Sequence, residues 1–250
     1  MFVAAALVPD TALLVPGAGG GADAGSVLRG AALEAVGQVA KDAIGQSGRV
    51  VVVAPGRRPR DVAGPVRASL GGAGVPDEAL GWPPGGAGLP RVGVPASVGV
   101  LLLAQHGVRT AHVHEVVADQ AVAQGTVPWL RALGGSLVER VPTALVVVGS
   151  ASARHGPDAP LADDPRAPAY DDALLADLAD AGPRARARLA ALDPDLASAL
   201  AVTGWAPWQV LLGAVRTAAV AGALLQRHVL AGATHAVLTW RNADLARDEW

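Results

Sequence analysis

The stretch Arg49–Pro55, with the sequence RVVVVAP, places four consecutive valines between an arginine and an Ala-Pro pair. A short β-branched run of this kind, with no alternating polar residues, is typical of a strand that is buried on both faces. Comparable runs cover Phe2–Val8, Ala111–Val117, Ala144–Val148 and Thr234–Trp240. Since helical segments separate most of these runs, the sequence predicts an α/β fold in which helices flank a mostly parallel or mixed central sheet.

Helices are predicted in the segments between the strands. The first helix is expected to run from Ser26, a residue type that caps helix starts, to about Gly45. Beyond Asp164 the C-terminal half is predicted to be largely helical, with one long apolar helix over Pro207–Leu230. The other predicted helices are Ser97–Gln105, Asp119–Leu137 with a break near Pro128, Pro165–Ala181, Arg184–Leu192 and Pro194–Val202.

Glycine and proline are concentrated between Pro55 and Pro95. This density of turn-forming residues predicts a long excursion from the sheet rather than a linker between two domains. Residues 1–250 are therefore predicted to form a single α/β domain, ending in the polar tail Arg241–Trp250. A chain of 250 residues with 51% apolar residues can bury a core of that size.

The composition argues against several classes of function. A formal net charge of -2 offers no basic surface, so we expect no nucleic-acid partner. The absence of cysteine excludes disulfides and zinc–thiolate sites and favours a cytoplasmic location. The apolar stretch Phe2–Val8 has no basic residue before it, as a signal peptide would, and Val210–Leu225 is short and interrupted by Arg216. We therefore expect no membrane span.

Two groups of side chains are suited to binding. Arg57, Arg58 and Arg60 follow the valine-rich strand, at the edge where α/β proteins bind ligands. Their guanidinium groups suit a carboxylate or a phosphate, and solvated loop charges are the alternative. His112 and His114 lie two residues apart on a predicted strand, so both point to one face and have a geometry that can chelate a metal ion. Spacing supplies no third ligand, and the alternative is a pair of ordinary strand residues near a sheet end.

The glycine-rich segment Gly17–Gly25 follows a predicted strand and precedes a predicted helix. Such a loop invites comparison with dinucleotide-binding loops, in which backbone N–H groups bind a pyrophosphate. The segment lies several residues beyond the strand, however, and no acidic residue ends the second strand. A simple crossover loop is the alternative.

Landmarks along the chain follow the order seen in a known family. The proline-flanked segment Val8–Pro16 follows the first strand, and the turn Ser150–Gly156 follows a later one. Tyr170–Asp171, the turn Leu192–Pro194 and the segment Gly204–Ala214 come next. In these segments the chain resembles the B-subunit-like family of class III extradiol ring-cleavage dioxygenases. The likeness covers most of the chain except its Gly/Pro-rich middle.

The resemblance implies an enzyme that opens a catechol ring with non-haem Fe(II), held by two imidazoles and one carboxylate. Asp10 stands where the family has its first histidine ligand, and the loop after the valine-rich strand holds no histidine for the second. The carboxylate expected just before Trp205 is also missing. His155 falls near the family's acid/base histidine and is the candidate catalytic residue. Arg57 and Arg154 are candidate substrate-binding residues, and Asp10 is the candidate metal ligand.

Simpler interpretations of these residues stay open. Asp10 follows Pro9 and also suits a turn, while His155 also suits an exposed loop. If the loops converge as the resemblance implies, Asp10, Arg57 and His155 line one cleft at the carboxyl ends of the strands.

Three functions are compatible with the sequence. We favour a class III extradiol dioxygenase-like protein that has a degenerate iron site and binds a small aromatic ligand. The first alternative is an active non-haem metal-dependent dioxygenase or other oxidoreductase, with Fe(II) or another metal on a rebuilt ligand set. That set would combine Asp10 and His155 with Asp158, Asp163 or Asp164. The second alternative is a structural or assembly module that forms a homodimer through the helix at 210–225 or an exposed strand.

Overall fold

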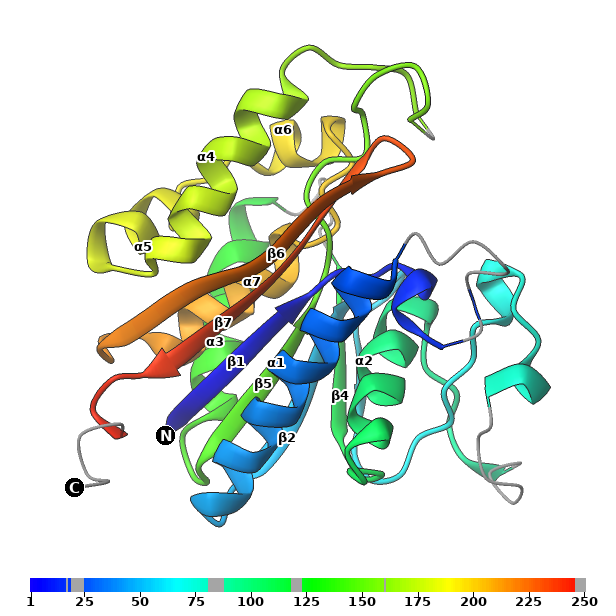
Figure 1. The fold of residues 1–250 in the computed structure, drawn as a ribbon. Helices are drawn as coiled ribbons and strands as arrows, with labels where there is room; N and C mark the ends of the chain where they lie inside the picture. The colour runs from blue at the N-terminus through cyan, green and yellow to red at the C-terminus, as the bar shows by residue number, and fades with distance from the viewer. Residues whose placement is uncertain (17, 19–24, 81–87, 118–122, 160, 246–250) are drawn as a thin grey trace.

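The computed structural model describes residues 1–16, 18, 25–80, 88–117, 123–159 and 161–245. Within these residues seven strands form one sheet in the order β3-β4-β2-β5-β1-β7-β6 (Figure 1). The parallel strands are β1 (Phe2–Val8), β2 (Arg49–Pro55), β4 (His112–Val116) and β5 (Thr143–Val148). The antiparallel strands are β3 (Arg60–Val62), β6 (Val220–Leu230) and β7 (Ala233–Asn242). The predicted α/β fold with a mixed sheet is confirmed.

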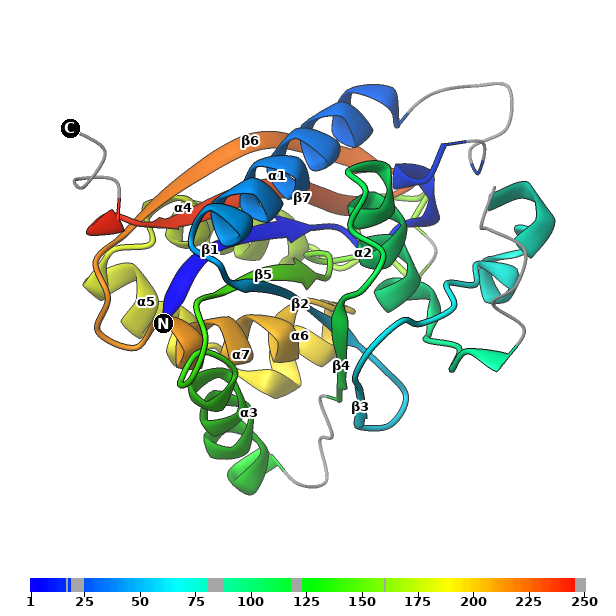
Figure 2. The same ribbon diagram turned by 90° about the horizontal axis from the view of Figure 1, so that it is seen from below.

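Helices cover both faces of this sheet (Figure 2). The chain steps from β1 to β2 to β4 in one direction across the sheet and then turns back to β5. Because such crossovers are right-handed, the helices before and after the turn lie on opposite faces. One face carries α1 (Ser26–Gly45) and α2 (Val94–Gln105). The other carries α3 (Ala123–Leu137), α4 (Ala167–Asp180), α5 (Pro183–Ala190), α6 (Pro194–Ala199) and α7 (Trp205–Val215).

Strand β2 shows why the valine run fits the centre of the sheet. Val50, Val52 and Ala54 pack into the core beneath α1 and α2. Val51 and Val53 point the other way, into the core beneath α3 and α7. Both faces are buried, as the sequence predicts, and each fully buried valine stabilises the fold by about 1.5–3 kcal/mol relative to exposure.

The Gly/Pro-rich excursion contributes an edge to the sheet. It leaves β2, pairs with β4 as the short strand β3, and then continues through two 3-10 helices, η2 (Gly71–Ala73) and η3 (Asp77–Leu80). Asp77 holds the segment together, since its carboxylate accepts from Arg67 at 3.1 Å and from Arg91 at 3.0 Å. The sequence predicts the excursion but not the edge strand within it.

Two predictions about helix ends are wrong. The single helix predicted over Pro207–Leu230 is a helix and a strand, because α7 ends at Val215 and the following residue, Arg216, has a φ of 49°. The chain then forms β6, whose backbone groups pair with β7 along its length. At the start of α1, Gly25 is the N-cap and Ser26 is the first helical residue, so Ser26 does not cap the helix.

The other predicted elements are confirmed, with shifts at their ends, except that α3 runs unbroken through Pro128, where a break is predicted. α2, for example, begins at Val94 rather than at Ser97. Residues 119–122 of the predicted third helix and residues 246–250 of the tail lie outside the described residues. None of the described helices is both long enough and apolar enough to cross a bilayer.

Candidate functional site

A cavity of about 690 Å³ lies at the carboxyl ends of the parallel strands. Asp10 reaches it from the segment after β1, Arg57 and Arg58 from the segment after β2, and Glu115 from the end of β4. The start of α2 closes another side. Parallel sheets place loops from several strands at this edge, which is where α/β proteins commonly bind ligands.

The cavity carries unpaired positive charge. Four arginines and two carboxylates line it, and Arg60 donates from Nη1 to Glu115 Oε2 at 3.0 Å. Arg91 is paired with a carboxylate outside the cavity, at 3.0 Å. Arg57 and Arg58 are exposed and form no ion pair with any described residue. As far as the described residues go, two guanidinium groups are therefore free to receive an anion.

Glu115 is a structural anchor of the cavity wall. Its side chain is almost fully buried, and Oε1 accepts from the backbone N–H of Gly93 at 2.5 Å, at the start of α2. Oε2 accepts from Arg60. Because both oxygens already have partners, Glu115 holds α2 and β3 against β4.

Asp10 belongs to a partly buried hydrogen-bonded chain. Ser150, directly after β5, donates from Oγ to Asp10 Oδ1 at 2.5 Å, and its oxygen lies 3.1 Å from Nδ1 of His235 on β7. Burial lowers the pKa of His235, and the nearby Asp10 carboxylate, which raises it, offsets only part of that effect. Ser150 thus fixes the carboxylate of Asp10 at the cavity wall.

His155 lies in a different network. Its Nε2 is 2.7 Å from Oδ2 of Asp171 on α4 and 3.1 Å from the hydroxyl of Thr234 on β7. Asp171 is fully buried and also accepts from the backbone N–H and the hydroxyl of Ser152, at 3.0 and 2.7 Å. The backbone N–H of His155 donates to the carbonyl of Gly232 at 2.9 Å. These bonds direct the histidine toward α4 and β7.

The structure brings together only part of the predicted site. Asp10 and Arg57 line the same cavity, whereas His155 and Arg154 are not among its lining residues. The prediction that Asp10, Arg57 and His155 line one cleft is therefore wrong for His155. Its side chain bonds to Asp171 on α4 and Thr234 on β7 instead. Arg154 donates from Nη1 to the carbonyl of Ala162 at 2.9 Å, and its buried Nε has no hydrogen-bond partner in the described part of the chain.

The acidic residues after His155 are engaged in their own loop. Asp163 accepts from the backbone N–H of Gly156 at 2.7 Å, and Asp164 accepts from Arg166 at 2.7 Å. The bond from Arg166 lowers the pKa of Asp164 to about 2. Asp158 is exposed. Among the described residues, none of the three acids joins Asp10 or His155 in a group close enough to share a metal ion.

A second group of polar side chains lies at the edge of the sheet formed by β3 and β4. His112 and His114 point to one face of β4, as their spacing predicts, with ring centroids 4.5 Å apart. Asp61 on β3 lies with them, so that one ligand atom of each residue falls within 4.8 Å of the others. Burial lowers the pKa of His114; Asp61 raises it and His112 lowers it further. The sequence misses Asp61 because the residue lies in the excursion.

Comparisons with known proteins bear on the fold. No protein-family model matches the chain, and no curated protein matches it. Among solved structures, the chain is similar to an uncharacterized protein from Escherichia coli K12, with a TM-score of 0.50 and 13% sequence identity. The match covers 96% of this chain and 99% of that one. At this identity the likeness concerns the fold alone.

The cavity does not have the donor set of an extradiol iron site. Fe(II) in that family requires two imidazoles and a carboxylate in one place. The described residues that line the cavity include no histidine, and both oxygens of Glu115 are already bonded. Asp10 alone remains as a metal-binding oxygen donor, so the residues present do not fit the iron. The loop Gly17–Gly25, considered above for a dinucleotide, lies almost wholly outside the described residues.

Proposed function

We propose that the protein is a class III extradiol dioxygenase-like protein that binds a small aromatic anion without iron-dependent ring cleavage. The observation that carries the proposal is the pair Arg57 and Arg58, two cavity arginines without ionic partners among the described residues. A cavity that holds unpaired guanidinium groups favours a ligand that brings its own carboxylate or phosphate.

The walls of the cavity support an aromatic ligand. Pro55, Val92, Val94 and Pro95 supply apolar surface in the same cavity as the charged groups. Ligand sites commonly combine such surface with a few polar groups, in volumes of roughly 300–1,000 Å³. A benzoate-sized molecule with one carboxylate matches both features.

The two alternatives have less support. An oxidoreductase with a rebuilt metal set would need Asp10 and His155 together, and the two belong to separate hydrogen-bonded networks. A homodimer stays a prediction. α7 is buried within the chain and is not available for it, whereas Leu225 and Val229 of the edge strand β6 are exposed.

Isothermal titration calorimetry with 3,4-dihydroxybenzoate as the ligand tests the proposal. We expect saturable binding of one molecule per chain and weaker binding of uncharged catechol, because only the benzoate brings a carboxylate to Arg57 and Arg58. The double variant R57Q/R58Q should weaken benzoate binding at least about tenfold, since a hydrogen bond to a charged group contributes about 1.5–3 kcal/mol. Fe(II) added in air should cause no more oxygen uptake with this probe than it does in a protein-free control.

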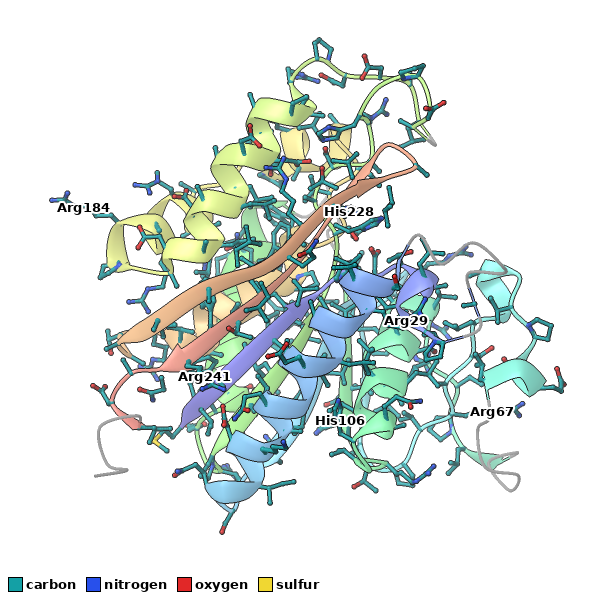
Figure 3. The ribbon with its side chains drawn as sticks, in the orientation of Figure 1. Arg29, Arg67, His106, Arg184, His228 and Arg241 are labelled. Atoms are coloured by element: carbon teal, nitrogen blue, oxygen red, sulfur yellow. The ribbon has the colours of Figure 1, made fainter. Side chains whose placement is uncertain are left out.

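The matched control is R184Q. Arg184 is an exposed arginine on α5, which projects at the opposite end of the molecule from the segment 55–80 (Figure 3). Its variant should bind the benzoate like the original protein. Equal binding by R57Q/R58Q and R184Q would contradict the proposed site, and oxygen uptake above that of the protein-free control would contradict the loss of iron chemistry.

A further inference from the structure

We propose that Asp61, His112 and His114 form a binding site for one divalent transition-metal ion of the zinc type. The site lies on the opposite face of β4 from the cavity wall at Glu115, and it does not rest on the proposed function. Three observations carry it: the register of two strands, an unpartnered buried imidazole, and the local charge.

Strand register gathers the three ligands. In the antiparallel pair of β3 with β4, Asp61 lies directly opposite His114, and Arg60 lies opposite Glu115. Side chains alternate along a strand, so His112 and His114 share one face while Glu115 takes the other. Directly opposed and diagonal neighbours on one face are within reach of long side chains. The pairing of β3 with β4 therefore fixes the backbone positions of all three ligand residues.

His114 supplies the observation that points to a ligand. The residue is only 5% exposed, and its Nε2 is buried with no hydrogen-bond partner in the described chain. Buried polar atoms are normally paired, so an orphaned ring nitrogen calls for an explanation. This Nε2 faces Asp61 Oδ1 at 3.8 Å, too far for a hydrogen bond. The imidazole nitrogen and the carboxylate oxygen are therefore close neighbours with no hydrogen bond between them.

The spacing suits a metal ion in that space. Zinc binds imidazole nitrogen and carboxylate oxygen at about 2.0–2.2 Å, which in a tetrahedron puts ligand atoms about 3.3–3.6 Å apart. The ligand atoms here all lie within 4.8 Å of one another, and His112 Nε2 already contacts Asp61 Oδ1. Small side-chain rotations at the edge of the sheet are enough to close the site.

Charge and access favour a divalent cation. Arg60, the cation next to Asp61 in sequence, pairs with Glu115 at 3.0 Å and not with Asp61. Asp61 and His114 also line a cavity of about 270 Å³ at this edge of the sheet, together with the ion pair Arg60–Glu115 and with Trp129 and Leu133 of α3. The cavity gives water access to complete the coordination. Two imidazoles and one carboxylate are a donor set that zinc accepts with one position left open.

Zinc titration of chelator-treated protein tests the site. We expect one Zn(II) per chain by calorimetry, and a stoichiometric visible ligand-field spectrum when Co(II) replaces it. H114A and D61N should each weaken Zn(II) binding at least tenfold, since even the loss of a group that only orients a ligand costs about 10–100-fold. D61N changes an exposed residue, so it tests the site even if H114A fails to fold.

The control is H228A. His228 is an exposed histidine on β6, at the opposite edge of the sheet (Figure 3). Its variant should bind Zn(II) like the original protein. The chain has six histidines, so nitrogen-15 spectra of the rings can identify those that bind; the expected result is that the ring signals of His112 and His114 alone shift. Absence of stoichiometric binding, or equal binding by D61N and the original protein, would overturn the site and would leave the benzoate-binding proposal untouched.

Discussion

At the scale of single residues, Asp171 shows how a buried charge is accommodated. Its carboxylate accepts from the N–H and the hydroxyl of Ser152 and lies 2.7 Å from Nε2 of His155. Burial of an ion is costly unless hydrogen bonds replace water, and here they come from groups on the turn after β5. The carboxylate therefore joins α4 to the carboxyl edge of the sheet.

Asp171→Ala should lower the free energy of unfolding by about 3 kcal/mol, because it leaves buried polar groups of Ser152 and His155 without their hydrogen-bond acceptor. Asp172→Ala is the matched control. Asp172 is 64% exposed and pairs with Arg227 on the surface, so its loss should cost about 0.5 kcal/mol or less. Urea denaturation of both variants measures the difference, and equal losses would show that the Asp171 network contributes little.

The sequence predicts some site residues and not others for physical reasons. The shared face of His112 and His114 follows from the two-residue period of a strand, which needs no tertiary information. Asp61 joins them only because β3 pairs with β4, and no pattern in the Gly/Pro-rich segment indicates that pairing. The position of His155 depends on Asp171, a partner on another element. Local periodicity is readable from the sequence, whereas these long-range contacts are not.

At the scale of elements, the packing of α3 on α7 depends on glycine. A Cβ added at Gly134 would lie 1.9 Å from the carbonyl oxygen of Val210, and one added at Gly213 would lie 2.1 Å from that of Arg131. Both contacts are with backbone atoms, which cannot rotate away. The two helices approach this closely only because neither glycine has a side chain.

Gly134→Ala should therefore force the helices apart and lower the free energy of unfolding by about 1–3 kcal/mol. The control is its neighbour, Gly135→Ala, whose Cβ would find its nearest atom at 3.8 Å, an ordinary contact. That substitution should be neutral or stabilising by up to about 1 kcal/mol, since alanine favours helix more than glycine does. Thermal melts of both variants measure the difference in stability. An equal loss of stability in Gly135→Ala would mean that the close contact between α3 and α7 is not its cause.

Helix and strand assignments from sequence succeed where the period is clear. Buried strands such as β2 and β5 are short β-branched runs between turns, and they are predicted close to their observed ends. The apolar segment after α7 has no such signature, because β6 is an edge strand rich in alanine and leucine. Its strand conformation depends on pairing with β7, and tertiary pairing of this kind overrides local propensity.

At the scale of the whole molecule, the sheet brings distant segments to one edge. Asp10 follows β1, Ser150 follows β5 and His235 lies on β7, yet the three form one hydrogen-bonded chain beside the cavity. The parallel order of β4, β2, β5 and β1 makes that meeting possible. Alternation of strands and helices predicts the parallel strands but not the contacts of Ser150 and His235. The cavity is thus a property of the topology, while its charge is set by single residues.

The hydrogen-bonded chain of Asp10, Ser150 and His235 makes the free energy of unfolding depend on pH. Burial lowers the pKa of His235 below its ordinary value of 6.5, although Asp10 opposes the shift and His228, across the strand pair, adds to it. Below about pH 6.5 the unfolded histidine takes up a proton that the folded one resists, so the free energy of unfolding should fall as the pH falls toward the lowered pKa. Above pH 6.5 this contribution is complete.

His235→Asn removes this proton uptake. It should flatten the fall in the free energy of unfolding between about pH 7 and pH 5.5, where one histidine contributes a slope of at most about 1.4 kcal/mol per pH unit. Urea denaturation at a series of pH values measures it, with a chelator present so that metal binding does not contribute. His228→Asn, at the exposed position across the strands, should keep most of the original slope. Identical slopes for His235→Asn and the original protein would mean that other groups cause the acid sensitivity, because the difference between these two curves isolates the proton on His235.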